Sequence, residues 1–134
     1  MELNAVTRSV NDIFSPNKIY LVPRFQREYS WGEEEILEFW DDIIHQITSS
    51  PDNNISNVEY FIGCIVLVGE DTKPEYLIVD GQQRLTTLTI LLRAIVARLN
   101  ALGDQTAAKA LYDNVIEGTD NDGKKYFKLT GVRL

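Results

Sequence analysis

Hydrophobic positions recur at regular spacings along this chain, and the longest regular pattern lies between residues 76 and 100. A short apolar run at 76–79 ends at the turn-forming pair Asp80-Gly81. After this pair, apolar residues recur at intervals of three and four, which predicts a helix over residues 83–100. That helix would bury one apolar side: Leu85, Leu88, Leu92, Ile95, Val96 and Leu99. The pattern therefore predicts a strand, a tight turn and a buried helix at the centre of the fold.

The rest of the pattern predicts further elements on both sides of this unit. Helices are expected at residues 6–14, 33–49 and 104–116, and strands at 18–22, 60–68, 75–79 and 126–129. The strand at 60–68 is apolar enough to be central in a sheet and would form a hairpin with 75–79. The helix at 33–49 would bury an apolar stripe: Ile36, Leu37, Trp40, Ile43, Ile44 and Ile47. The sequence thus predicts one α+β domain over 1–134, with a small mixed sheet packed against helices.

Composition and charge limit the classes of function. The 134 residues carry a formal net charge of −7, which argues against a protein that coats nucleic acid broadly. No apolar run approaches a membrane span and the N-terminus lacks a signal-peptide pattern, so we expect a cytoplasmic protein without a membrane partner. With Cys64 and His45 as the only cysteine and histidine, an internal disulfide, a cysteine zinc site and a histidine-dependent triad are excluded within this chain. Cys64 is expected in the core and His45 on a helix flank.

The turn at residues 80–84 is the main candidate for chemistry. It would place Gln82, Gln83 and Arg84 at the start of the central helix, where backbone N–H groups and the helix dipole favour an anion. A cation is unfavourable there unless it shares a bound phosphate with the backbone amides. The alternative is an ordinary turn whose arginine forms an ion pair with the acidic helix. Glycine patterns typical of P-loops and of dinucleotide-binding folds are both missing from the sequence.

A second candidate group precedes the acidic helix at 33–49. Arg27, with Arg24 nearby, would provide a further phosphate contact, and Gln26 would contact a base or ribose. The alternative is a surface arginine paired with neighbouring acidic residues. Tyr29 and Trp31 would stack on a base of a nucleotide or of DNA, because aromatic faces bind bases with little sequence preference. For Trp31 we favour packing at the start of the following helix.

Four blocks of this sequence resemble one known family. The segment at 80–84 resembles the DGQQR motif of the prokaryotic family described as domain of unknown function 262, which includes the N-terminal part of GmrSD-type modification-dependent restriction enzymes. Residues 22–31 resemble its first motif (Pro-x-x-Gln-Arg-x-Tyr-x-Trp), 40–43 its Trp-x-Asp-Ile, and 60–63 its Phe-Leu-Gly. The DGQQR block also resembles the phosphate box of ParB proteins and the glycine-rich box of sulfiredoxin. The resemblance implies a ParB/sulfiredoxin-like fold with the central strand–turn–helix at 76–100.

This resemblance also implies an activity. Members bind and hydrolyse nucleoside triphosphates, coupled to DNA recognition in phage defence. Carried over to this sequence, Arg84 would hold phosphate, Gly81 would let the backbone approach, and the amides of Gln82 and Gln83 would complete the cradle. Either glutamine would orient the attacking water. Asp80 would hold Mg²⁺ through water or cap the turn.

Two threonines follow the motif. Thr86 and Thr87 would donate hydroxyl hydrogen bonds to phosphate; the more common alternative is a hydroxyl that bonds back to its own helix or faces the core.

Members of this family usually have longer chains, with further helices and often a C-terminal HNH-type nuclease. The resemblance therefore implies an N-terminal part of a longer protein, which would contact DNA through the full-length protein and act with a nuclease domain or partner subunit. Two alternatives stay open: a non-hydrolysing module that binds DNA phosphates through the same arginines, and a module that docks a partner on the acidic helix at 33–42.

Overall fold

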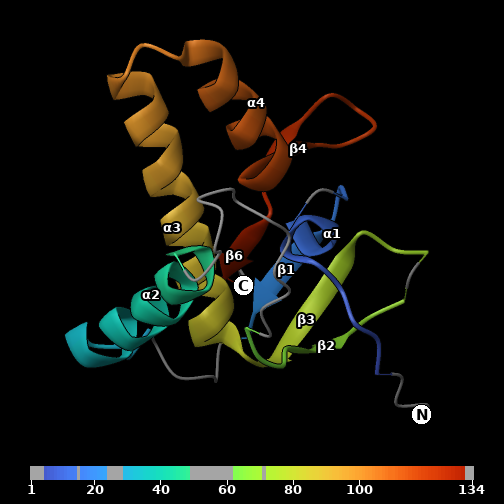
Figure 1. Ribbon diagram of the computed structural model, residues 1–134. Helices are drawn as coiled ribbons and strands as arrows, with labels where there is room; N and C mark the ends of the chain where they lie inside the picture. The colour runs from blue at the N-terminus through green and yellow to red at the C-terminus, as the bar shows by residue number, and fades with distance from the viewer. Residues whose placement is uncertain (1–4, 15, 24–28, 49–61, 71, 132–134) are drawn as a thin grey trace.

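A computed structural model describes residues 5–14, 16–23, 29–48, 62–70 and 72–131 of the chain (Figure 1). The fold is α+β, with a small mixed sheet and helices, as the pattern predicts. Along the chain the elements are α1 (Val10–Phe14), β1 (Ile19–Val22), α2 (Glu33–Thr48), β2 (Val66–Val68), β3 (Glu75–Asp80), α3 (Gln82–Ala101), α4 (Gln105–Val115), β4 (Glu117–Thr119), β5 (Lys125–Phe127) and β6 (Leu129–Gly131).

The main sheet has the strand order β2-β3-β1-β6. Strand β1 pairs in parallel with both β3 and β6, whereas β2 is antiparallel to β3. Strands β4 and β5 form a separate two-stranded ribbon. Figure 1 shows α3 and α4 side by side as an antiparallel pair that extends beyond the sheet. The predicted β3–turn–α3 unit is confirmed, and it connects the sheet directly to the longest helix.

The core gathers side chains from the sheet and from all four helices. Tyr20 and Ile78 face it from neighbouring strands, while Leu77 and Val79 are exposed on the other side of β3, as the alternation of strand side chains requires. The buried cluster consists of Phe14, Tyr20, Phe39, Ile78, Leu85, Leu88, Val115 and Ile116.

The predicted strand at 60–68 is wrong in length and in place. Within the described residues this strand begins only at Val66, and β2 lies at the edge of the sheet. The physical reason is Gly63, whose φ of 136° takes the chain out of the extended conformation. Residues 63–65 lie instead against the turn and first residues of α3. Cys64 is consequently exposed, which contradicts its predicted place in the core.

The prediction for the apolar side of α2 is wrong in part. Phe39 is buried and Ile43 packs on the core, but Ile36, Leu37 and Trp40 are exposed. The apolar arc of this helix is wider than its contact with the fold, so one edge of the arc packs and the other faces solvent. His45 is exposed on α2, as expected for a helix flank. On α3, Ile95 is likewise exposed rather than buried.

The predicted strand at 126–129 is divided in two at Lys128. This lysine is 1 % exposed, and its Nζ donates hydrogen bonds to the carbonyl oxygens of Phe14 and Asn114, both at 2.6 Å. These carbonyls lie at or near the C-terminal ends of α1 and α4, where a cation is favourable. The chain therefore changes from β5 to β6 around a buried cation, a device that strand periodicity does not predict.

None of the helices in the described ranges is long and apolar enough to cross a membrane.

Candidate functional site

The turn between β3 and α3 depends on a glycine for two reasons. Gly81 has a φ of 91°, in the left-handed region, and directly precedes the first residue of α3. A Cβ at this position would lie 3.0 Å from the carbonyl oxygen of Cys64 and 3.1 Å from Cγ1 of Ile65. Without a side chain, Gly81 provides no side-chain cap for α3. The start of this helix is therefore uncapped and lies directly against residues 64–65.

Arg84 is held by backbone rather than by a carboxylate. Its Nη1 donates to the carbonyl oxygen of Cys64 at 3.2 Å. The guanidinium lies so close to Gly63 that a Cβ there would be 2.3 Å from Cζ of Arg84. No ion pair between described residues includes Arg84, and its buried Nε has no hydrogen-bond partner among them. The ion pair with the acidic helix, which was the ordinary alternative for this arginine, is thus not observed.

Gln83 connects α3 to the segment before α2. Its side-chain Oε1 accepts hydrogen bonds from the backbone N–H groups of Ser30 and Trp31, at 2.7 and 3.2 Å. One turn later, the Thr87 hydroxyl donates to the Gln83 carbonyl oxygen at 2.7 Å and lies 2.8 Å from the Tyr29 hydroxyl. The first of the four sequence blocks therefore meets the start of α3 through Gln83, in the last block, and through Thr87, which follows it.

The ring of Trp31 packs edge-on against Phe39, with ring centroids 5.6 Å apart. This contact confirms the interpretation that Trp31 packs at the start of α2. The bond from Thr87 to its own helix likewise confirms the ordinary alternative for that threonine.

A comparison with known protein families identifies the family of this chain. Residues 10–132 match the N-terminal domain of the GmrSD restriction endonucleases. This chain belongs to that family. A search of curated proteins found no match. The family resemblance drawn from the four sequence blocks is confirmed, and it covers all elements from α1 to β6.

The other predicted site residues of this GmrSD-family domain differ in how they are placed. Asp80 is exposed at the end of β3, and Gln82 and Thr86 are half-buried in the first turns of α3. Tyr29 is 40 % exposed and keeps part of its ring open to solvent. Arg24, Gln26 and Arg27 lie outside the described residues.

A metal ion would find few protein ligands here. Among the described residues, no group of three or more histidine, cysteine, aspartate or glutamate side chains is placed to hold one. Asp80 is the one carboxylate of the 80–84 turn. Mg²⁺ is typically bound through one or two carboxylates together with substrate phosphates and water, so Asp80 fits a magnesium ion that arrives with a triphosphate rather than a metal bound by protein alone.

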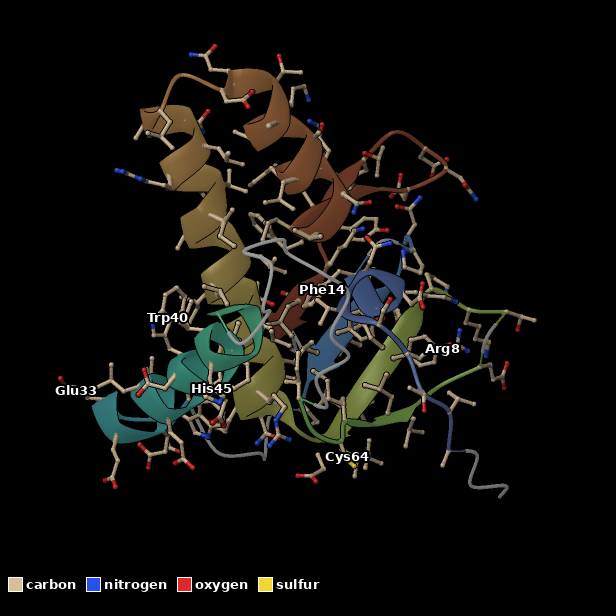
Figure 2. All side chains as sticks on the ribbon, in the orientation of Figure 1. Arg8, Phe14, Glu33, Trp40, His45 and Cys64 are labelled. Atoms are coloured by element: carbon tan, nitrogen blue, oxygen red, sulfur yellow. The ribbon has the colours of Figure 1, made fainter. Side chains whose placement is uncertain are left out.

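Two residues that support Arg84 were missed by sequence reasoning, namely Gly63 and the main chain of Cys64. Both were assigned to a strand. The signal that could have found them is an isolated glycine inside an apolar run, which often marks a close approach of the backbone. In Figure 2 the labelled Cys64 lies at the lower edge of the sheet, near the start of α3.

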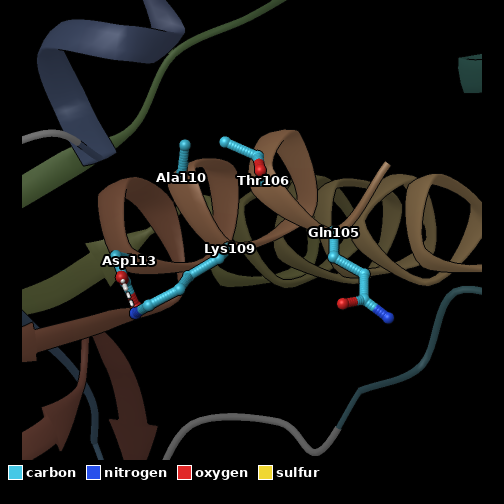
Figure 3. Close-up of a pocket in the computed structure, with 5 residues that line it drawn as sticks. All are labelled: Gln105, Thr106, Lys109, Ala110 and Asp113. Atoms are coloured by element: carbon cyan, nitrogen blue, oxygen red, sulfur yellow. Dashed lines mark hydrogen bonds and ion pairs between the residues drawn. The ribbon is translucent and has the colours of Figure 1, made fainter. Parts of the chain in front are cut away.

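A hollow on the outer side of α4 is separate from this site (Figure 3). Its lining residues all belong to α4: Gln105, Thr106, Lys109, Ala110 and Asp113. An ion pair of 2.6 Å between Lys109 and Asp113 lies across it. One helix face with paired charges offers no converging polar groups, so we assign it no function.

Proposed function

We propose that this domain binds a nucleoside triphosphate at the start of α3 and hydrolyses it with Mg²⁺. The observation that carries the proposal is Arg84, a cation in the first turn of a helix, unpaired with any described carboxylate and fixed by a backbone carbonyl. A cation at this end of a helix is unfavourable unless an anion binds beside it. Uncapped amides, a glycine turn and an arginine fork together match the donor arrangement that phosphate takes.

The residues would divide the work as follows. Arg84 would contact the phosphates, together with the backbone amides of Gln82 and Gln83, and the Thr86 hydroxyl would add a donor. In hydrolysis, water forms a bond to the terminal phosphorus as the bond to the bridging oxygen breaks, which releases the nucleoside diphosphate, inorganic phosphate and a proton. Gln82 is the better candidate to orient this water, because the side-chain oxygen of Gln83 is already engaged by Ser30 and Trp31.

The segment before α2 would close the other side of the site. Arg24 and Arg27 would add phosphate contacts, Gln26 a contact to base or ribose, and Tyr29 a stacking surface. Support comes from Gln83 and Thr87, whose contacts hold residues 29–31, the end of this segment, on α3. Asp80 would hold the Mg²⁺ that comes with the nucleotide, and the ion would supply charge neutralisation at the phosphates.

The setting of the proposed activity follows from the family. A GmrSD N-terminal domain is a component of a restriction system. We infer that nucleotide hydrolysis serves modification-dependent DNA sensing in the cytoplasm, in a longer protein or complex that also contains an HNH-type nuclease. We also keep the ParB/sulfiredoxin-like relationship as a prediction, supported by the strand–glycine turn–helix unit that places Arg84.

The test is calorimetry with the purified chain, all four ribonucleoside triphosphates and Mg²⁺. Arg84→Ala is compared with Arg98→Ala, which removes the same charge from the last turn of the same helix. We expect binding to be lost or strongly weakened only in Arg84→Ala, and phosphate release to follow the same pattern. If both variants bind as the wild type does, the turn is structural and the proposal is wrong.

The two other functions give different results in the same experiment. A non-hydrolysing DNA-binding module would bind duplex DNA without nucleotide, and its affinity would fall steeply with salt. A net charge of −7 disfavours this outcome. A pure docking module would bind neither nucleotide nor DNA, whichever arginine is replaced.

A further inference from the structure

The outward side of α2 carries an apolar strip that the fold does not use. Ile36, Leu37 and Trp40 are 39 %, 50 % and 44 % exposed. Figure 2 shows Trp40 and Glu33 on this helix, which lies at one side of the molecule. A tryptophan is an expensive residue to leave open to water, since its ring carries the largest apolar surface of any side chain. Ile36 and Leu37 lie four and three residues before Trp40, on the adjacent helical turn, so the three side chains form one continuous strip.

The exposed Leu37 and Trp40 lie on a different side of α2 from Phe39, which packs on the core. The helix contacts the core through Phe39 and Ile43, and Trp31 packs on Phe39 at its start. At 100° per residue, Leu37 and Trp40 are turned away from Phe39. Their exposure therefore follows from the helix geometry, and a small change of side-chain rotamer would not bury them.

Acidic side chains border the same strip. Glu33 and Glu34 lie one turn before Leu37, and Asp41 lies one turn after it, so all three are its neighbours on the helix surface. All three are exposed. The ion pairs seen between described residues involve Lys73, Lys109 and Lys125 and none of these acids. The strip thus combines open apolar surface with carboxylates that have no cation beside them in this part of the chain.

We propose that this strip docks an amphipathic helix of a partner protein, with lysine or arginine beside its apolar face. The partner's apolar residues would cover Leu37 and Trp40, and its cations would reach Glu33, Glu34 and Asp41. A tryptophan at the centre of such a contact is the residue type that most often dominates interface energetics. A second copy of this chain is a poorer occupant, because it carries the same net charge of −7 and the same acids. Nucleic acid is excluded by the sign of the charge.

The test uses a defined probe, a fluorescein-labelled helical peptide of about 18 residues, or five turns, built from leucine on one face and lysine beside it. Binding to the chain is measured by fluorescence polarisation. We expect Trp40→Ala to weaken binding by about tenfold or more, as for a central interface residue. The matched control is Ile90→Ala, which truncates a 55 % exposed isoleucine on α3 and should leave affinity unchanged.

A second variant tests the charges. The double variant Glu34→Lys/Asp41→Lys should bind the leucine–lysine peptide more weakly than the wild type does. It should bind more tightly a peptide in which glutamate replaces lysine. Because all substituted residues are exposed, circular dichroism should be unchanged in each variant. No binding by the wild type, or equal losses in Trp40→Ala and Ile90→Ala, would overturn the proposal. Self-association of the wild type that Trp40→Ala abolishes would assign the strip to a second copy, and would overturn it too.

Discussion

The starts of α3 and α4 differ in their N-cap residue and in the charge of their first turn. The N-cap of helix α4 is Asp104, whose side chain accepts a hydrogen bond from the Ala107 N–H at 3.1 Å. The N-cap of helix α3 is Gly81, which has a φ of 91° and supplies no side-chain cap. Its first turn also contains Arg84, a cation at the positive end of the helix dipole.

This difference indicates what each start is for. An aspartate cap satisfies a free N–H group and typically adds about 1 kcal/mol of stability. The start of α3 lacks this contribution, and its first turn contains a cation that interacts unfavourably with the helix dipole. Yet this helix contributes Leu85 and Leu88 to the core. A bound anion would satisfy both the free amides and the arginine, so we interpret α4 as having a structural start and α3 a binding one.

The largest expected effect comes from removing the cation. Arg84→Ala should weaken nucleotide binding by roughly 10- to 100-fold, the range for a lost charge-assisted hydrogen bond. The urea midpoint should stay the same or rise slightly, because the variant removes an unfavourable charge–dipole interaction. Calorimetry and urea unfolding measure the two quantities. A large drop in stability with unchanged binding would reverse our interpretation of α3.

A second prediction moves the guanidinium without removing its charge. In Gly63→Ala the new Cβ would displace the end of the Arg84 side chain, so nucleotide affinity should fall by about tenfold, one order of magnitude or 1.4 kcal/mol. Gly103→Ala is the control, because it shares a positive φ (88°) but has no neighbouring atom within 4 Å. Both variants should lose about 1 kcal/mol of stability through backbone strain. Equal nucleotide affinities in the two proteins would show that Gly63 does not position Arg84.

The third prediction separates the two glutamines. Gln83→Ala leaves the N–H groups of Ser30 and Trp31 without their acceptor, so unfolding free energy should fall by about 1–2 kcal/mol. Gln82→Ala should leave stability unchanged and slow phosphate release. Urea unfolding and a phosphate-release assay distinguish them. The assignment of the water-orienting role to Gln82 is wrong if the two variants hydrolyse equally fast.

A smaller effect is expected at the start of α4. Asp104→Ala removes the cap and should cost about 1 kcal/mol of unfolding free energy. Nucleotide affinity should not change, since Asp104 shares no contact with the 80–84 turn in the described structure. Thermal or urea unfolding measures the first quantity and calorimetry the second. A change of affinity here would mean that the two helix starts are coupled.

The smallest expected effect is a pH dependence of stability that comes from Tyr20, which lies at neither helix start. Burial, and then the nearby Tyr76, raise the pKa of Tyr20 from 10.0 to about 12. The unfolded chain therefore loses this proton first, and unfolding free energy should fall as pH rises from about 10 toward 12. In Tyr20→Phe the unfolding free energy should fall less steeply with pH, whereas in Arg84→Ala it should fall as steeply as in the wild type. Urea midpoints measured at pH 9, 10 and 11 test this.

The sequence predicted the elements well wherever one short pattern decides them. The apolar run, the Asp80-Gly81 pair and the three–four spacing after it identified β3, the turn and α3 within one residue at the helix start. The α2 helix was also identified, but its buried edge was not. Seven apolar positions spread over a wide arc do not say which edge meets the core, and here the contact falls on Phe39 and Ile43.

The sequence alone determined the fold class, the conformational need for glycine at position 81 and the membership of the chain in its family, because each rests on local patterns. Only the tertiary structure decided the surroundings of the arginine. Arg84 meets the carbonyl of Cys64 across 20 residues of chain, and Gln83 meets the N–H of Ser30 across 53. Such partners are chosen by how the elements pack, since a periodic pattern specifies which face of an element is apolar but not which distant backbone will lie against its polar end.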